Sequence, residues 1–168
     1  EIMTDNYPDI TARITTFIQQ SAPTNGVVIG ISGGIDSALV LGLCVQTLGA
    51  DKVTGLFMPQ SENDVDDVIK NYVQQLGVQS EMLPIGPIFE AYQKYGSIAD
   101  DKVVAGNVKA RIRMGLLYSR SNANGLCVMG TGNRSELLTG YFTKYGDGGV
   151  DYLPIGDLYK TQVRGLAR

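Results

Sequence analysis

The chain has 168 residues, of which 43% are apolar and none is histidine, and its formal net charge is −3 at pH 7. This length predicts one domain with a buried core, and the lack of both a signal peptide and an apolar run of roughly 20 residues predicts a cytoplasmic protein that does not span a membrane. The composition excludes a Ser-His centre and a histidine-bound zinc site within these residues, and the acidic total disfavours nucleic acid as the ligand, although the basic residues gathered in residues 106–168 suit a small phosphorylated molecule.

The first half of the chain reads as strands alternating with helices. Residues 27–32 form an apolar run typical of a buried strand, and residues 35–48 follow as a largely apolar helix after a very short turn. Residues 52–58 predict a second strand, and residues 64–76 carry apolar side chains at helical spacing. These two strand–helix units indicate parallel strands.

The second half continues the alternation. It predicts a strand, a short helix, a longer helix and a fourth strand, at residues 79–85, 87–95, 105–122 and 126–129. Residues 145–152 are rich in glycine and predict a loop. Residues 158–168 have a helical composition but no residue that ends a helix, so we expect C-terminal residues to be missing.

Together these elements predict an α/β fold: a Rossmann-like, doubly wound parallel sheet with helices on both faces. Ligands of such sheets bind beyond the carboxyl ends of the strands. The turns at residues 33–34 and 130–132 each follow a predicted strand, so we expect both to face one crevice.

The two cysteines, Cys44 and Cys127, each lie within an apolar run. This environment is typical of buried free thiols rather than of a disulfide framework or a metal cluster.

The turn Ser32–Ser37 (Ser-Gly-Gly-Ile-Asp-Ser) lies between the first strand and its helix. Unpaired N–H groups, two hydroxyls and the positive end of a helix meet there, which predicts a phosphate-binding nest. The turn lacks the lysine of a Walker loop and the glycine spacing of a dinucleotide fingerprint. A plain strand-to-helix turn is the alternative interpretation.

Two carboxylates accompany the glycine-bearing turns. Asp36 beside a phosphate nest would repel its ligand unless a cation lay between them, and magnesium is the natural cation. Glu136 follows the second turn, so both carboxylates could share a metal ion with phosphate oxygens. The alternative for Glu136 is an ordinary acidic residue in the first turn of a helix.

Basic residues on the helix predicted at residues 105–122 fall into two groups. Lys109, Arg113 and Arg120 form one stripe, which we predict to be solvated. Arg111 stands on a different side, so it is the arginine that we expect in a binding site, with an exposed surface residue as the alternative.

The segment after the second turn is aromatic and rich in glycine. We predict that Tyr141, Phe142 and Tyr145 belong to the core, because aromatic side chains gain much from burial. Asp147 is best explained by turn chemistry, and Asp151 less well.

These residues together resemble a known family. Ser32–Ser37 resembles the signature of the N-type ATP pyrophosphatases, which release pyrophosphate rather than ADP. The segments at residues 106–111, 130–136 and 140–151, followed by Leu153-Pro154, are similar to those of NAD synthetases. The resemblance covers nearly the whole chain. It implies one NAD synthetase domain over residues 1–168 that lacks its C-terminal residues.

The resemblance also implies a role for each matching residue. ATP would be bound by Gly30, Ile31, Ser32, Gly33, Gly34, Ile35, Asp36, Ser37, Thr131 and Lys160. Magnesium would be bound by Asp36 and Glu136, and deamido-NAD by Arg111, Lys144 and Asp151. The catalytic residues would be Asp36, Lys144 and Lys160.

The implied reaction is the ATP-dependent amidation of deamido-NAD to NAD with free ammonia, through an adenylated intermediate, with release of AMP and pyrophosphate. The resemblance further implies a homodimer. Two alternatives stay open: another ATP pyrophosphatase, such as a tRNA-thiolating enzyme or the synthetase domain of an amidotransferase, and a nucleotide-binding module without catalysis.

Overall fold

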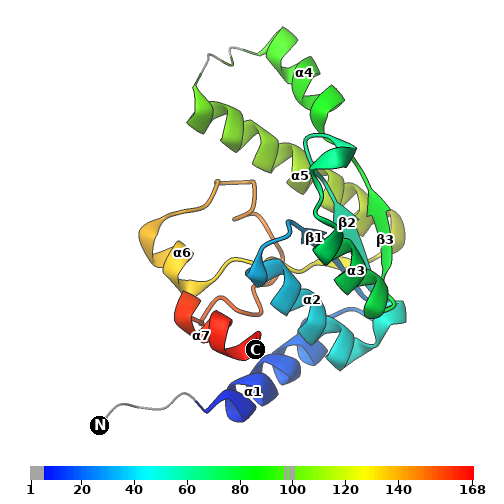
Figure 1. Cartoon of the computed structure of the whole chain (residues 1–168), viewed down its shortest axis with the longest axis vertical. Helices are drawn as coiled ribbons and strands as arrows, with labels where there is room; N and C mark the ends of the chain where they lie inside the picture. The colour runs from blue at the N-terminus through cyan, green and yellow to red at the C-terminus, as the bar shows by residue number, and fades with distance from the viewer. Residues whose placement is uncertain (1–5, 97, 99–100) are drawn as a thin grey trace.

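The computed structural model describes residues 6–96, 98 and 101–168. Its centre is a parallel sheet in the order β3-β2-β1-β4 (Figure 1), formed by β1 (Val27–Ile31), β2 (Val53–Phe57), β3 (Gln79–Met82) and β4 (Cys127–Val128). Val27 in β1 is aligned with Val53 on one side and Cys127 on the other. The predicted parallel α/β sheet is therefore confirmed.

The order of the strands creates a crevice at one edge. From β1 the chain proceeds outward to β2 and β3, and it then crosses back to place β4 on the other side of β1. At such a topological switch point the connections leave neighbouring strands in opposite directions, which opens a space beyond their carboxyl ends. The turns after β1 and β4 both lie at that space.

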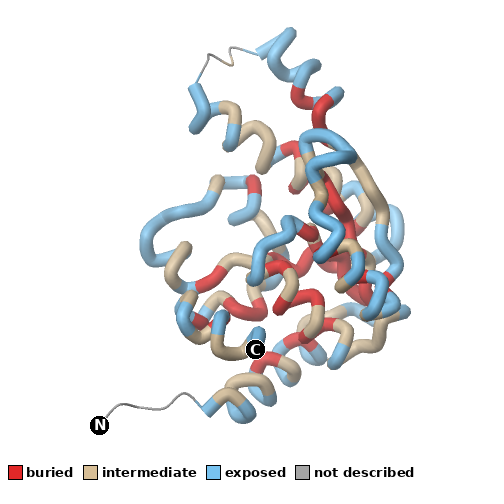
Figure 2. The backbone as a smooth tube through the Cα atoms, viewed as in Figure 1, coloured by how far each residue is buried: buried red, intermediate tan, exposed pale blue. Residues whose placement is uncertain are grey.

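Helices cover both faces of the sheet. One face carries α1 (Tyr7–Ser21), α2 (Ile35–Leu48), α3 (Asp67–Gln75) and α7 (Lys160–Leu166), and the other carries α4 (Gly86–Tyr95) and α5 (Lys102–Asn124). Alternate strand residues supply the two cores: Val27 and Ile29 pack in the first, whereas Val28 packs in the second. In Figure 2 the buried backbone runs through the middle of the molecule, along the sheet. The prediction of helices on both faces is confirmed.

The ends of several helices differ from the prediction for local reasons. Asp66 accepts from the amide of Val68 and begins α3 at Asp67, while the residues before it form a separate 3₁₀ helix, η2 (Glu62–Asp64). Asp101 accepts from two amides and begins α5 three residues earlier than predicted. No element was predicted for α1, which Asn6 caps and which has a proline in its first turn.

Two further elements are η1 (Ala50–Lys52) and α6 (Arg134–Thr139). An irregular segment at residues 140–159 connects α6 to α7. The predicted glycine-rich loop at residues 145–152 has no regular structure apart from a single bridge between Met129 and Tyr152. No helix among residues 6–96 and 101–168 has the length and apolar character needed to cross a membrane.

Candidate active site

A large cavity lies at the carboxyl ends of β1 and β4. Its volume is about 1150 Å³. It is lined by both glycine-bearing turns, by the end of β2, by α5 and by the segment after α6, including Gly30, Ile31, Ser32, Gly33, Gly130 and Thr131. The expectation that the two turns face one crevice is therefore confirmed.

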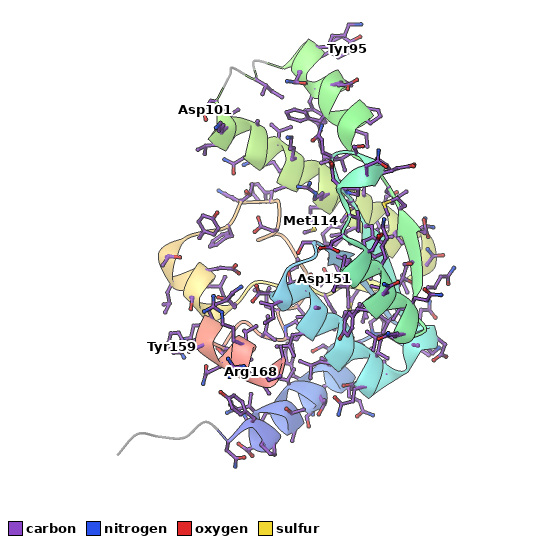
Figure 3. All side chains as sticks on the ribbon, in the orientation of Figure 1. Tyr95, Asp101, Met114, Asp151, Tyr159 and Arg168 are labelled. Atoms are coloured by element: carbon purple, nitrogen blue, oxygen red, sulfur yellow. The ribbon has the colours of Figure 1, made fainter. Side chains whose placement is uncertain are left out.

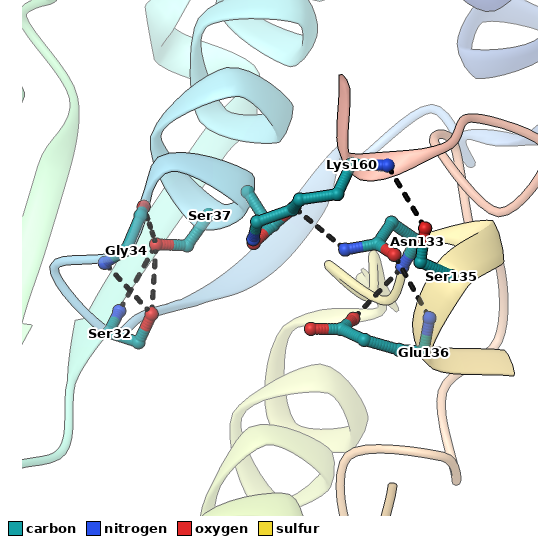
Figure 4. Close-up of polar contacts among 8 residues, drawn as sticks. Ser32, Gly34, Ser37, Asn133, Ser135, Glu136 and Lys160 are labelled. Atoms are coloured by element: carbon teal, nitrogen blue, oxygen red, sulfur yellow. Dashed lines mark hydrogen bonds and ion pairs between the residues drawn. The ribbon is translucent and has the colours of Figure 1, made fainter. Parts of the chain in front are cut away.

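Serine side chains hold the turn between β1 and α2 in shape. The Ser37 hydroxyl, which is buried, donates to the Gly34 carbonyl at 2.9 Å and accepts from the Ser32 amide at 3.3 Å. The Ser32 hydroxyl accepts from the Gly34 amide at 3.2 Å, and Gly33 has a φ of +82° (Figure 4). No side chain caps the N-terminus of α2. The amides of its first turn are therefore left for a ligand, as an anion-binding nest requires.

A chain of polar contacts joins Asp36 to Glu136. One Asp36 carboxylate oxygen accepts from the Lys160 ammonium and the other from the Asn133 side-chain amide, the latter at 3.0 Å. The backbone amide of Asn133 donates to Glu136 Oε2 at 3.1 Å, and the Glu136 amide donates back to Asn133 Oδ1 at 3.1 Å. Asn133 is fully buried. Both predicted carboxylates, Asp36 and Glu136, therefore accept hydrogen bonds from the same residue, Asn133.

The placement of Lys160 follows from contacts between α6 and α7. The Arg134 amide donates to the Leu158 carbonyl at 2.8 Å, and the Lys160 amide donates to the Ser135 hydroxyl at 3.1 Å. The two short helices therefore begin side by side, and the side chain of Lys160 reaches across to the first turn of α2. Figure 4 shows the contact between Lys160 and Ser135 at the start of these two helices.

Arg111 and Lys144 lie together on an exposed part of the surface. Arg111 Nε donates to the Lys144 carbonyl at 3.1 Å, and the Lys144 ammonium lies 5.0 Å from the centre of the Tyr145 ring. Neither residue lines the cavity. The structure therefore brings these two predicted residues to one place, beside the cavity rather than in it.

Asp151 is held by structural contacts. Its carboxylate accepts from the Val128 amide and from the Tyr118 hydroxyl, each at 2.8 Å. Burial, helped by the hydrogen bond to Asp151, raises the pKa of Tyr118 to about 12. In Figure 3 Asp151 lies near the centre of the molecule. The contacts of its carboxylate tie the loop to β4 and α5.

The basic stripe on α5 was predicted to be solvated, and this prediction is wrong. The Lys109 ammonium lies 4.6 Å from the centre of the Phe89 ring, and Arg120 forms an ion pair with Glu81. Arg113 lines the cavity, and its Nε donates to the Met58 carbonyl at 2.8 Å. Burial lowers the pKa of the Arg113 guanidinium, which still carries its charge at neutral pH. The stripe faces α4 and the ends of the strands, and helical spacing alone does not show which face of a helix meets a neighbour.

The aromatic residues after α6 were predicted to lie in the core, which is also wrong. Tyr141 is 80% exposed and Tyr145 72% exposed, and Phe142 is 44% exposed. This segment is anchored by polar contacts instead: Asp147 accepts from the Thr143 amide at 2.7 Å, as turn chemistry predicted. Tyr141 and Phe142 line the cavity. A glycine-rich loop leaves the surface of the sheet and carries its aromatic side chains outward.

Sequence reasoning did not place two residues at the candidate site: Arg113, which lines the cavity, and Asn133, which contacts Asp36. The signal for Asn133 was available, because Asn followed three residues later by Glu is the pattern of a capping box. That pattern predicts the bonds within α6 but not the bond to Asp36, 97 residues away.

Cys44 and Cys127 are free and buried, as predicted.

Among the described residues, no group of three or more Cys, Asp or Glu side chains is arranged to hold a metal ion. Asp36 and Glu136 therefore offer two carboxylates and no complete protein cage.

The sheet order, the uncapped turn after β1 and the linked carboxylates define an α/β protein with a large cavity at the switch point of its sheet. Residues 7–168 match the family described as NAD synthase, and the chain belongs to this family.

Individual relatives agree with this assignment. The NH(3)-dependent NAD(+) synthetase of Pyrococcus furiosus is 48% identical over 164 residues, which are 97% of this chain and 63% of that protein. The structure is similar to the NH3-dependent NAD synthetase of Campylobacter jejuni, with a TM-score of 0.91 and 38% identity over 98% of this chain and 73% of that one. It is also similar to NMN synthetase of Francisella tularensis, with a TM-score of 0.87 and 33% identity over 97% of this chain and 70% of that one. The chain thus spans less than two thirds of the length of the Pyrococcus protein.

Proposed function

We propose that the protein is an ammonia-dependent NAD synthetase, a ligase that forms a carbon–nitrogen bond. The observation that carries the proposal is the hydrogen-bonded link from Asp36 through Asn133 to Glu136, next to the turn after β1, whose residues Ser32 and Gly33 line a large cavity. The names of the relatives support the same reaction. The substrates are ATP, deamido-NAD and ammonia.

The turn after β1 binds the phosphates of ATP in this proposal. The free amides at the start of α2 and the hydroxyl of Ser32 provide donors, the buried Ser37 hydroxyl holds the turn in shape, and Thr131 adds a hydroxyl from the opposite turn. Typical small-ligand sites occupy roughly 300–1,000 Å³. The cavity volume of about 1150 Å³ leaves room for ATP and for the reacting end of a second substrate.

Asp36 and Glu136 fit a magnesium ion. Mg²⁺ is commonly held by one or two carboxylates together with the phosphates of a substrate, and it does not require a cage of protein ligands. Both residues supply hard oxygen ligands, and both accept a hydrogen bond from Asn133. When bound, the ion would offset the charge of the phosphates and of the departing pyrophosphate. Lys160 is the cation already beside Asp36, and it is placed to contact the same phosphates.

Deamido-NAD binds through Arg111, Lys144 and Asp151 in this proposal. Arg111 and Lys144 adjoin one another on the exposed surface beside the cavity. Only the reacting end of deamido-NAD would enter the cavity. The rest of the dinucleotide would lie along this surface.

The surface beside Arg111 and Lys144 also supports a homodimer. Tyr141 and Tyr145 are large, exposed aromatic side chains, which are enriched at protein interfaces. Sedimentation velocity would test this assembly, and a monomer at micromolar concentration would contradict it.

The proposed chemistry proceeds in two steps. An oxygen of the nicotinate carboxylate attacks the α-phosphorus of ATP, the bond to the β-phosphate oxygen breaks, and pyrophosphate leaves. Ammonia then attacks the activated acyl carbon, AMP leaves with the bridging oxygen, and the nitrogen loses a proton to form the amide. Lys144 and Lys160 would offset negative charge as two anions approach, and Asp36 would orient the cations that surround the phosphates.

The free thiols of Cys44 and Cys127 support a cytoplasmic location, because thiols stay reduced in that compartment.

An assay of products tests the proposed function. The purified protein should convert ATP to AMP and pyrophosphate over repeated turnovers only when Mg²⁺, deamido-NAD and ammonium are all present, with NAD formed in equal amount. ADP as the product, or the same release without deamido-NAD, would contradict the proposal.

A second candidate reaction is the amidation of nicotinic acid mononucleotide, which the similarity to NMN synthetase favours. Replacing deamido-NAD by the mononucleotide in the same assay separates the two. A higher kcat/KM for the mononucleotide would select the second candidate.

A further inference from the structure

Asn133 is an unusual residue for the inside of this protein. It is one of three buried polar or charged residues among those described, together with Ser37 and Ser121. Burial of an amide group is unfavourable unless its donors and acceptors are paired. Asn133 meets this condition with a side-chain bond to Asp36, two bonds to Glu136 and a carbonyl that accepts from the Leu137 amide at 3.1 Å.

Capping of α6 explains only part of these contacts. An N-cap needs a side-chain oxygen that accepts from an amide in the first turn, and Ser, Thr and Asp provide one as well as Asn does. The Asn133 amide nitrogen has no role in the cap. It points instead at α2, where it donates to Asp36 Oδ1 at 3.0 Å. Among the common cap residues only Asn combines an acceptor for its own helix with an NH₂ donor for another.

The consequence concerns the orientation of both carboxylates. The Asn133 side-chain amide donates to Asp36 Oδ1. The other oxygen, Oδ2, therefore faces the cation, which in this structure is the Lys160 ammonium. The Asn133 backbone holds Oε2 of Glu136. One buried residue therefore sets how the two carboxylates lie relative to each other.

We propose that Asn133 is a positioning residue for magnesium–ATP: its side-chain amide orients Asp36 relative to Glu136 so that both carboxylates are prepared to share the ion. This inference rests on the proposed function for the identity of the ligand. Partners that orient metal ligands typically contribute roughly 10–100-fold to metal affinity.

The test separates positioning from capping. Asn133→Ser keeps an acceptor for the Glu136 amide but loses the donor to Asp36, and Asn133→Thr repeats the change with a second cap residue. Asn133→Ala loses both functions. The control is Asn6→Ser, an Asn-to-Ser change at the cap of α1, where the Asn6 side chain accepts from the Asp9 amide.

Mn²⁺ replaces Mg²⁺ as the probe, and its binding is followed by electron paramagnetic resonance with ATP present and no second substrate. We expect Asn133→Ser and Asn133→Thr to bind Mn²⁺–ATP about 10–100-fold more weakly than the wild type and to keep cooperative thermal unfolding. Asn133→Ala should bind as weakly as Asn133→Ser and unfold at a lower temperature, because it also loses the cap. Asn6→Ser should bind like the wild type.

A double variant shows whether Asn133 acts through Asp36. In the Asp36→Asn background the additional change Asn133→Ser should weaken Mn²⁺–ATP binding no further. Wild-type affinity in both Asn133→Ser and Asn133→Thr would overturn the inference, and so would a wild type without ATP-dependent Mn²⁺ binding. A wild type that binds Mn²⁺–ATP, shows the loss in Asn133→Ser and yet makes no NAD would leave the inference standing and contradict the proposed function.

Discussion

The Lys160 ammonium forms an ion pair with the Asp36 carboxylate, and this contact joins the first turn of α7 to the first turn of α2, 124 residues earlier in the chain. The Asp36 side chain is 15% exposed and that of Lys160 35% exposed. A cation therefore already stands beside the carboxylate that would otherwise repel phosphate from the nest.

Loss of this ion pair should affect both stability and nucleotide binding. We expect Lys160→Met to lower the free energy of unfolding by about 1–2 kcal/mol, between the values for exposed and for buried pairs, as measured by urea denaturation. ATP affinity, measured by calorimetry, should fall about tenfold, because one charge-assisted contact to phosphate is lost.

The matched control for Lys160→Met is Arg120→Met. Arg120 forms an ion pair with Glu81 of β3, and the Arg120 side chain is as exposed as that of Lys160. This variant should lose comparable stability and retain wild-type ATP affinity. Equal ATP affinity in Lys160→Met and the wild type would contradict a role for Lys160 in binding.

The turn after β1 should tolerate no side chain at Gly33. Its φ of +82° is unfavourable for other residues, and a Cβ there would point into open space that we assign to phosphate. We expect Gly33→Ala to lose about 1–2 kcal/mol of stability and most of its ATP affinity. Gly77→Ala is the control, because Gly77 has a φ of +70° at the end of α3 and lies outside the cavity. If both variants bound ATP alike, the turn would not be the phosphate site.

The two neighbouring arginines of α5 should have separable roles. Arg113 lines the cavity, so Arg113→Gln should weaken ATP binding by about tenfold through the loss of a half-buried cationic donor. Arg111 lies outside the cavity beside Lys144, so Arg111→Gln should leave ATP binding unchanged and raise the KM for deamido-NAD. Calorimetry with ATP and steady-state kinetics make this comparison, and the reverse pattern would exchange the two assignments.

The two thiols should be unreactive while the protein is folded. Burial raises the pKa of Cys44 to about 12 and that of Cys127 to about 11, so both stay protonated at pH 8. Iodoacetamide should therefore modify neither thiol in the folded protein and both in urea, as read by mass spectrometry. Rapid modification of the folded protein at pH 8 would contradict this burial.

The same shifts predict how stability changes in alkali. Because the folded pKa values lie above the ordinary value of 9.0, the associated stability is fully present below pH 9 and is lost as the pH rises toward 11–12. Thermal melts between pH 8 and 12 should show a falling midpoint, and Cys44→Ala should reduce the slope of that fall.

Much of the fold was predictable because its signals are local. The apolar run of β1 and the helical spacing of α3 each depend on a few consecutive residues, and alternation of strands with helices implies a parallel sheet. Helix α1 was not predicted, and among the predicted elements the boundaries shifted where single cap residues such as Asp66 and Asp101 decide the first turn. The direction in which Arg113 points was not predictable, since it depends on what packs against α5.

The sequence by itself determined the order of the predicted elements, the turn Ser32–Ser37 that we propose as the phosphate site and the two carboxylates that accompany the glycine turns, because each depends on a short run of residues. Only the tertiary structure decided that Asn133 joins those carboxylates, that Lys160 neutralises Asp36 and that the aromatic segment after α6 lies at the surface. The physical reason is separation along the chain: hydrogen bonds spanning 97 and 124 residues form only when the switch point of the sheet brings their partners together.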